Sequence, residues 1–319
     1  MAESGSPLAH GESYNPLGVR LRFFLMPAKL PALICLCALQ LLFAWHGARA
    51  QGGPPFLTDD PETPGSHHWE INAGFIANHT PANAYYQTPD FDFNYGLGDR
   101  IQLKYELPIA SHTDENNVTS TGLGESLLGV KWRFYEHRRP DAPANAGDTV
   151  NFAIGTYPQL SLDNPTSAVR RGIVEPGPQF LLPVVANGRV GPMQLDTEAG
   201  YWFSNHNAPN FWILGVLASH DFTDRTELAV EIYHEQDVNS VGGFPKQHQT
   251  TFDIGGRQAL NKSRSILLLF MGGRSLVNVT RTNGQADWIA YVGFQLLLGP
   301  KTSNPQVEKT VPIEQPHFR

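Results

Sequence analysis

The chain lacks several features that would each point to a familiar class of protein. Its two cysteines are Cys35 and Cys37, so the chain from Gln51 onward holds none. This excludes disulfides, thiol nucleophiles and cysteine–metal sites from that part. Basic residues are also few, with 23 Lys and Arg against 30 Asp and Glu, and the net charge is −7. Because binding of phosphate backbones needs a basic surface, we expect no nucleic-acid partner.

Long hydrophobic runs are limited to one, near residues 30–45. Basic residues precede it, and Ala48-Arg49-Ala50 follows it as a small-x-small cleavage site. This order predicts a secretory signal peptide over residues 1–50 rather than a spanning helix. Because the region before the run is long for a signal peptide, we expect translation to start at Met26. Expression that survives mutation of the first start codon would support that start.

Helical periodicity is also lacking, and from His68 onward apolar and polar residues alternate in short runs. Such alternation is typical of strands with two different faces. The clearest run is 122–134, where Trp132 lies on one face and Lys131 and Arg133 lie on the other. We predict twelve strands, at 68–78, 87–95, 101–109, 123–136, 149–160, 174–186, 190–203, 210–221, 226–236, 249–259, 264–274 and 286–298.

The connectors between these strands alternate in length. Tight turns of Gly, Asn and Asp, such as Asn187-Gly188-Arg189, alternate with longer polar connectors, such as 110–122, and only 137–148 breaks the rule. A tilted strand needs about 9–11 residues to cross a bilayer, which most of these strands have. The pattern predicts an all-β, up-and-down antiparallel transmembrane β-barrel with short periplasmic turns and longer external loops.

This fold divides the chain into four parts. The signal peptide is followed by an extended N-terminal segment at 51–67, the barrel at 68–298 and a disordered, proline-containing tail at 299–319. In one interpretation the segment folds into the periplasmic mouth as a plug, where Asp59 and Asp60 meet Lys131 or Arg133. In the other interpretation it is a flexible leader.

The charged faces of the strands are expected to point into the barrel, because a charge facing lipid near the midplane costs about 2–4 kcal/mol. We call these residues the lumen set, and acids outnumber bases among them. They either brace the lumen by pairing with one another or line a path that favours cations or neutral polar solutes. The lumen set is Lys104, Glu106, Glu125, Lys131, Arg133, Glu198, Glu227, Glu231, Glu235, Asp253 and Arg257.

Two other constellations invite a catalytic or metal-binding interpretation. His67 and His68 are adjacent and not spaced to hold one metal ion, so we expect a structural pair. Ser204 and His206 lie in one external loop, which invites comparison with an outer-membrane phospholipase. A nucleophile and its base usually come from different strands, so a plain polar loop is the expected interpretation. We therefore predict no catalytic residue, no metal site and no cofactor.

Three motifs resemble a family of bacterial outer-membrane proteins. They are Phe56–Pro61 with His68-Trp69-Glu70, Tyr95–Arg100, and Gly122–Phe134 with its Leu-Gly-Val-Lys-Trp-Arg-Phe core. Together they resemble the transporter-like family named for the "MetA-pathway of phenol degradation". The resemblance implies an outer-membrane barrel that passes small, often aromatic or hydrophobic, compounds. Glu125 stands where this family is expected to have Asp.

We therefore expect an exported outer-membrane channel or transporter for small molecules, and not an enzyme. Its expected partners are the solute, outer-membrane lipid and the barrel-assembly machinery, and its oligomeric state is left open. The alternatives are an outer-membrane lipid hydrolase that uses Ser204 and His206, a closed structural or adhesive barrel, and a soluble periplasmic β-protein.

Overall fold

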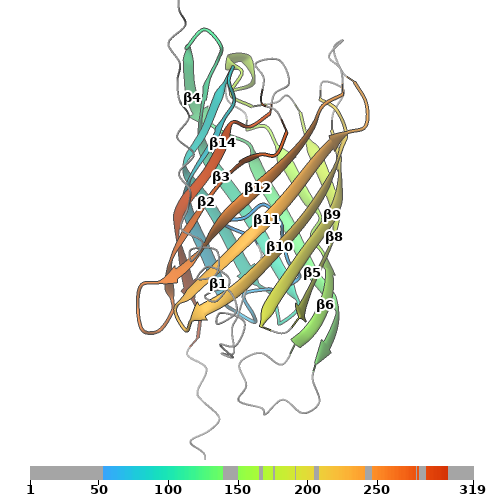
Figure 1. The fold of residues 1–319 in the computed structure, drawn as a ribbon, viewed down its shortest axis with the longest axis vertical. Helices are drawn as coiled ribbons and strands as arrows, with labels where there is room; N and C mark the ends of the chain where they lie inside the picture. The colour runs from blue at the N-terminus through green and yellow to red at the C-terminus, as the bar shows by residue number, and fades with distance from the viewer. Residues whose placement is uncertain are drawn as a thin grey trace, which may run out of the picture. The chain divides into compact units, whose positions relative to one another are not determined.

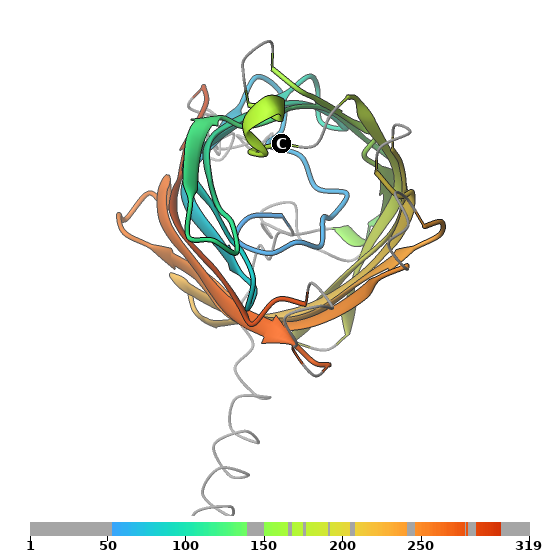
Figure 2. The same cartoon turned by 90° about the horizontal axis from the view of Figure 1, so that it is seen from above.

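The computed structural model describes residues 53–138, 150–164, 168–174, 177–190, 192–204, 208–240, 246–277, 279 and 285–300. They form a single antiparallel sheet of 14 strand segments that closes into a barrel (Figures 1 and 2). One short 3-10 helix, η1 (Val169–Arg171), lies in a connector. Within the described ranges no helix is long and apolar enough to cross a membrane. The predicted signal peptide, the Met26 start and residues 301–319 of the tail lie outside the described residues.

The segments follow the chain around the wall. They are β1 (Trp69–His79), β2 (Ala84–Gly96), β3 (Ile101–Thr113), β4 (Thr119–Leu123), β5 (Ser126–Arg138), β6 (Val150–Thr156), β7 (Gln159–Leu162), β8 (Gln179–Val190), β9 (Met193–Phe203), β10 (Phe211–Thr223), β11 (Thr226–Asp237), β12 (His248–Ala259), β13 (Ile266–Ser275) and β14 (Trp288–Leu298).

The 14 segments occupy twelve positions around the barrel. β4 and β5 share one position because both pair with β3. β6 and β7 share another, since each pairs with β5 and with β8. The ring closes where β1 pairs with β14, with Trp69 opposite Leu298. The predicted twelve-strand antiparallel barrel is therefore confirmed.

Two predicted connectors are wrong. Asn187-Gly188-Arg189 is part of β8, whose ladder with β9 continues until Val190 pairs with Met193. The turn thus falls beside Pro192, which has no N–H to donate to a ladder. The predicted connector 110–122 is mostly strand, and only residues 114–118 separate β3 from β4. Cross-strand pairs of Ser and Thr hydroxyls support this extension, as at Ser111 and Thr121, whose oxygens are 2.8 Å apart.

Strands whose alternation is blurred in the sequence prove to be apolar on both faces. In β13, Leu269 and Met271 are buried inside the barrel, while Leu268 and Phe270 lie on the other side of the strand. The inner side chains belong to an interior apolar cluster that also holds Phe56 of the N-terminal segment. The inner wall is therefore apolar where Phe56 packs against it, so these strands do not alternate between apolar and polar residues.

Candidate functional site: the occupied lumen

The outer surface of the barrel is apolar along most of its strands. Outward residues in the middle of strands, such as Val130, Val216 and Ile254, are exposed. Trp69 and Trp288, each the first residue of its strand, lie near opposite ends of the barrel. A closed ring with an apolar outside and polar residues inside satisfies every wall hydrogen bond without water. This surface fits contact with lipid.

The inside of the barrel is occupied by the N-terminal segment, which we define as residues 53–63. The last residue of the segment lies beside the β2–β3 turn, where Thr63 Oγ1 donates to the carbonyl of Asp99 at 3.0 Å. Figure 2 shows the segment in blue crossing the interior of the ring of strands. Thr58 and Asp60 are both 0% exposed, although neither belongs to a strand. The segment therefore fills part of the lumen.

Two glutamates of the lumen set hold the backbone of this segment. Glu231 of β11 accepts hydrogen bonds from the N–H groups of Leu57 at 3.2 Å and Thr58 at 2.5 Å. Glu198 of β9 accepts one from the N–H of Asp59 at 3.0 Å. Hydrogen bonds to charged groups typically contribute about 1.5–3 kcal/mol each, so these contacts favour a docked segment over a flexible leader.

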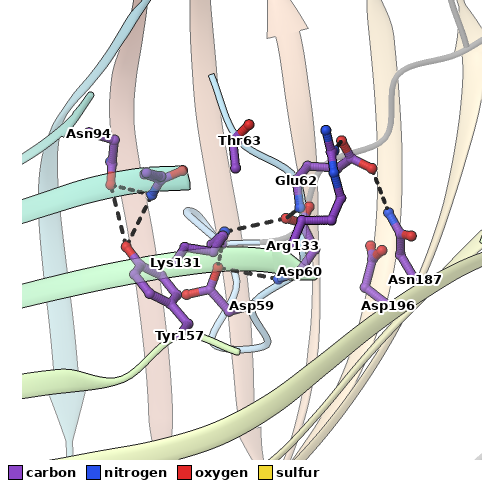
Figure 3. Close-up of polar contacts among 12 residues, drawn as sticks. Asp59, Asp60, Glu62, Thr63, Asn94, Lys131, Arg133, Tyr157, Asn187 and Asp196 are labelled. Atoms are coloured by element: carbon purple, nitrogen blue, oxygen red, sulfur yellow. Dashed lines mark hydrogen bonds and ion pairs between the residues drawn. The ribbon is translucent and has the colours of Figure 1, made fainter. Parts of the chain in front are cut away.

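Basic residues of β5 meet the acidic side chains of the segment (Figure 3). The Nζ atom of Lys131 lies 2.9 Å from Oδ1 of Asp59 and 3.4 Å from Oδ1 of Asp60. Arg133 lies 2.5 Å from Glu62, whose other oxygen accepts a hydrogen bond from Asn187 at 3.0 Å. The structure thus brings together the residues that the plug interpretation pairs, and adds Glu62 and Asn187 to them.

Arg257 of β12 holds the beginning of the segment. Its guanidinium donates to the carbonyl oxygens of Gly53, at 3.1 Å, and Pro54, at 2.9 Å. The same group pairs with Glu227 of β11 at 3.2 Å. A planar guanidinium can serve carbonyls and a carboxylate at once, which a lysine ammonium does less well. Arg257 therefore ties the segment to the far side of the barrel from β5.

Phe56 gives the segment an apolar anchor that the sequence analysis missed. It is buried in an interior cluster with residues of β10 and β13, among them Leu217, Leu269 and Met271. The signal in the sequence was the failure of alternation in these strands. Apolar residues on the inner face of a wall that otherwise carries charge indicate that something apolar packs inside.

Gly215 of β10 lets the segment approach the wall. A Cβ atom at this position would lie 2.2 Å from Oγ1 of Thr58 and 3.0 Å from its Cβ. Cβ contacts as short as 2.2 Å essentially never occur in proteins, so a side chain here must move Thr58 or the strand. The absence of a side chain at Gly215 is part of how the segment fits.

We expect Gly215→Ala to displace the segment and raise the single-channel conductance without changing any charge. The matched control is Gly272→Ala on β13, where an added Cβ would meet no atom within 4 Å. Conductance measured in planar bilayers should rise for the first variant and stay at the parental value for the second. Equal conductance in both would mean that Thr58 is not pressed against the wall.

Beside the segment, a second group of charges lies on β2 and β3. The Nζ atom of Lys104 lies 2.7 Å from Glu106 and 3.6 Å from Asp92. Asp90 is 5% exposed, and its Oδ1 atom is buried without a hydrogen-bond partner. Lys104 thus pairs with two carboxylates, and the carboxylate of Asp90 lies on the same inner face. This part of the lumen is locally acidic.

The connector between β7 and β8 folds over the other end of the barrel. Its residues Ala168, Ile173 and Val174 are buried against Ala110 of β3. Arg171 donates from Nη1 to the carbonyl of Thr121 in β4 at 2.7 Å. Figure 2 shows η1 over the rim of the ring. The connector between β7 and β8 is therefore partly packed against the barrel.

The remaining members of the lumen set lie on the same inner face or at its rim. Glu125, in the break between β4 and β5, accepts a hydrogen bond from Ser161 at 2.5 Å. Asp253 accepts one from Thr251 at 3.0 Å, and both are fully buried. Glu235 is half-buried near the end of β11. The lumen set is thus braced by hydrogen bonds as well as by ion pairs.

Within the part of the chain that the structure describes, His67 and His68 contact different groups and do not form one site. His67 contacts the Tyr95 hydroxyl at 3.0 Å, whereas His68 contacts the carbonyl of Ser66 at 2.8 Å. Among the described residues, no group of three or more His, Cys, Asp or Glu is arranged to hold a metal ion. His206 lies outside the described residues, so the predicted plain polar loop around Ser204 stays a prediction.

No family model matches the chain, and no curated protein matches it. The fold is similar to a solved outer membrane channel from Pseudomonas putida F1, with a TM-score of 0.58 and 14% identity over 78% of this chain and 100% of that chain. NanC porin aligns with a TM-score of 0.48 and 7% identity over 72% of this chain and 98% of its own. The first likeness supports the barrel fold. The resemblance of the three motifs to the phenol-degradation family is not confirmed.

Proposed function

We propose that this protein is an outer-membrane channel for small molecules in which the N-terminal segment forms the constriction. The observation that carries the proposal is the docking of residues 53–63 inside a closed barrel whose outside is apolar. Export by the predicted signal peptide and insertion by the barrel-assembly machinery belong to this proposal. The proposal assigns no enzyme activity.

The charged residues of the lumen favour one class of solute. The lumen set carries seven acidic and four basic residues, and the segment adds Asp59, Asp60 and Glu62. Rings of acidic side chains favour cations over anions in pores. Phe56 and Tyr157 also lie inside the barrel, but they are only 5% and 1% exposed and offer a solute almost no apolar surface. We infer small solutes with neutral or positive charge; passage of aromatic or hydrophobic compounds rests on the family resemblance alone.

The test is single-channel recording in a planar bilayer, with protein purified from the outer membranes of cells that express the full chain. Discrete conductance steps with a preference for cations would support the proposal. Recovery of the protein in the soluble fraction would contradict it, since the outer surface would then face water.

A closed structural barrel is the second candidate, and one observation favours it. The ion pairs and hydrogen bonds from β5, β9, β11 and β12 to the segment converge from opposite sides of the lumen. A correctly folded barrel that stays silent, even after the segment is removed, would establish this candidate and overturn the channel.

A further inference from the structure

We propose that the N-terminal segment sets the charge selectivity of the lumen, with Asp59 and Asp60 cancelling a lysine that would otherwise repel cations at the constriction. The solutes that benefit are small cations. This inference rests on the proposed channel function and adds a second role to the segment, beyond reducing the cross-section. It assigns specificity to residues of the segment rather than to the barrel wall.

The first step concerns the position of the positive charges. Lys131 and Arg133 are only 3% and 6% exposed, and both lie on the inner face of β5. Within the described residues, both carboxylates that pair with Lys131 belong to the segment. Arg133 pairs with Glu62 of the segment and with Glu136 of its own strand. Removing the acidic residues of the segment would therefore leave Lys131 without the two carboxylates that contact it.

The second step concerns the negative charges on the opposite wall. The segment meets Glu198 and Glu231 with backbone N–H groups, which carry no net charge. The segment therefore places no positive charge opposite these two glutamates. It meets bases of the wall with carboxylates and acids of the wall with neutral N–H groups. Its docking makes the narrow part of the lumen more acidic than the wall alone.

The third step is the effect of these charges on permeant ions. In a narrow, low-dielectric passage the field of fixed charges is focused, so a few charges at the constriction outweigh many at the rims. A lone Lys131 there would oppose cation entry. The pair of Asp59 and Asp60 reverses this sign, because two carboxylates face one ammonium group at 2.9 and 3.4 Å.

The test compares variants that change charge at constant volume. Reversal potentials are measured in a planar bilayer under a KCl gradient, with full-length protein extracted from outer membranes. Asp59→Asn with Asp60→Asn should lower the ratio of potassium to chloride permeability. Lys131→Gln should raise it, since it removes the positive charge that faces both carboxylates. The matched control is Asp224→Asn, which removes an exposed charge in the turn between β10 and β11.

The opposite signs expected for the two variants separate selectivity from simple widening. A pore that widens because the segment is released would lose selectivity in both variants, and that outcome would overturn the inference. Unchanged reversal potentials in both would also overturn it. Silence of both the parental channel and the variant that lacks the segment would instead overturn the proposed function. If the double variant does not fold, Glu62→Gln replaces it, since Glu62 is less buried and its loss should lower cation preference through Arg133.

Discussion

Deletion of residues 53–62 is expected to raise the single-channel conductance several-fold. These residues carry the contacts to Glu198, Glu231 and Arg257, and they lie inside the ring of strands. The wall itself is held by continuous ladders from β1 round to β14, so the barrel does not need the segment for closure. The conductance of the deletion variant in planar bilayers, compared with the parental protein, measures the effect.

The control for this deletion keeps the chain length. Replacing residues 53–62 by Gly and Ser retains the same number of residues but removes Phe56 and the acidic side chains. We expect this variant to fluctuate between conductance levels, because a chain without anchors does not stay docked. A deletion variant that conducts like the parent would show that the segment does not limit the passage, and the constriction would then lie elsewhere.

Substitution of Ile254 by Arg is expected to destabilise the membrane-inserted barrel by about 2–4 kcal/mol, the cost of a lipid-facing charge near the midplane. Ile254 lies in the middle of β12, pairs with Val230 of β11, and is 59% exposed on the outer surface. Because Gly255 and Asp253 on either side point inward, the added charge has no route into the polar lumen. Chemical denaturation of the protein in lipid vesicles measures the loss.

Leu298→Arg is the matched control for this substitution. Leu298 is also exposed on the outer surface, but it is the last residue of β14. Near the edge of the bilayer the same charge costs about 0–1 kcal/mol, because it reaches the headgroups. Equal and large losses for both variants would indicate a packing defect. Equal and small losses would mean that the outer surface faces water, which contradicts the membrane barrel.

These predictions separate two roles of charge in the chain. Many charges that point inward are paired, as Lys131 is with Asp59, and we expect their loss to change passage through the lumen. A charge introduced on the outer surface has no partner there, and it lowers the stability of the membrane-inserted barrel. Breaking a buried pair by removing one partner typically costs about 3–5 kcal/mol, so the inward variants also need a check of folding. Heat-dependent migration of the barrel on electrophoresis provides it.

The wall of the barrel was predictable because its signal is local. Alternation of apolar and polar residues within β3, β5 and β11 reports one lipid-facing and one lumen-facing side, whatever the rest of the chain does. The turn after β8 was misplaced because Asn187 and Gly188 are good turn formers in isolation. In the folded chain they pair with β9, and Asn187 donates its side-chain N–H to Glu62.

The sequence by itself determined the strand number, the faces of most strands and the acidic character of the lumen. It also suggested that Asp59 and Asp60 meet Lys131, since complementary charges lie at the same mouth of the barrel. Only the tertiary structure decided how the segment is held. Thr58 and Glu231 are 173 residues apart in the chain, and no local pattern relates them. Closure of the ring brings β9, β11 and β12 around residues 53–63, and the fit of Thr58 against Gly215 exists only once that ring has formed.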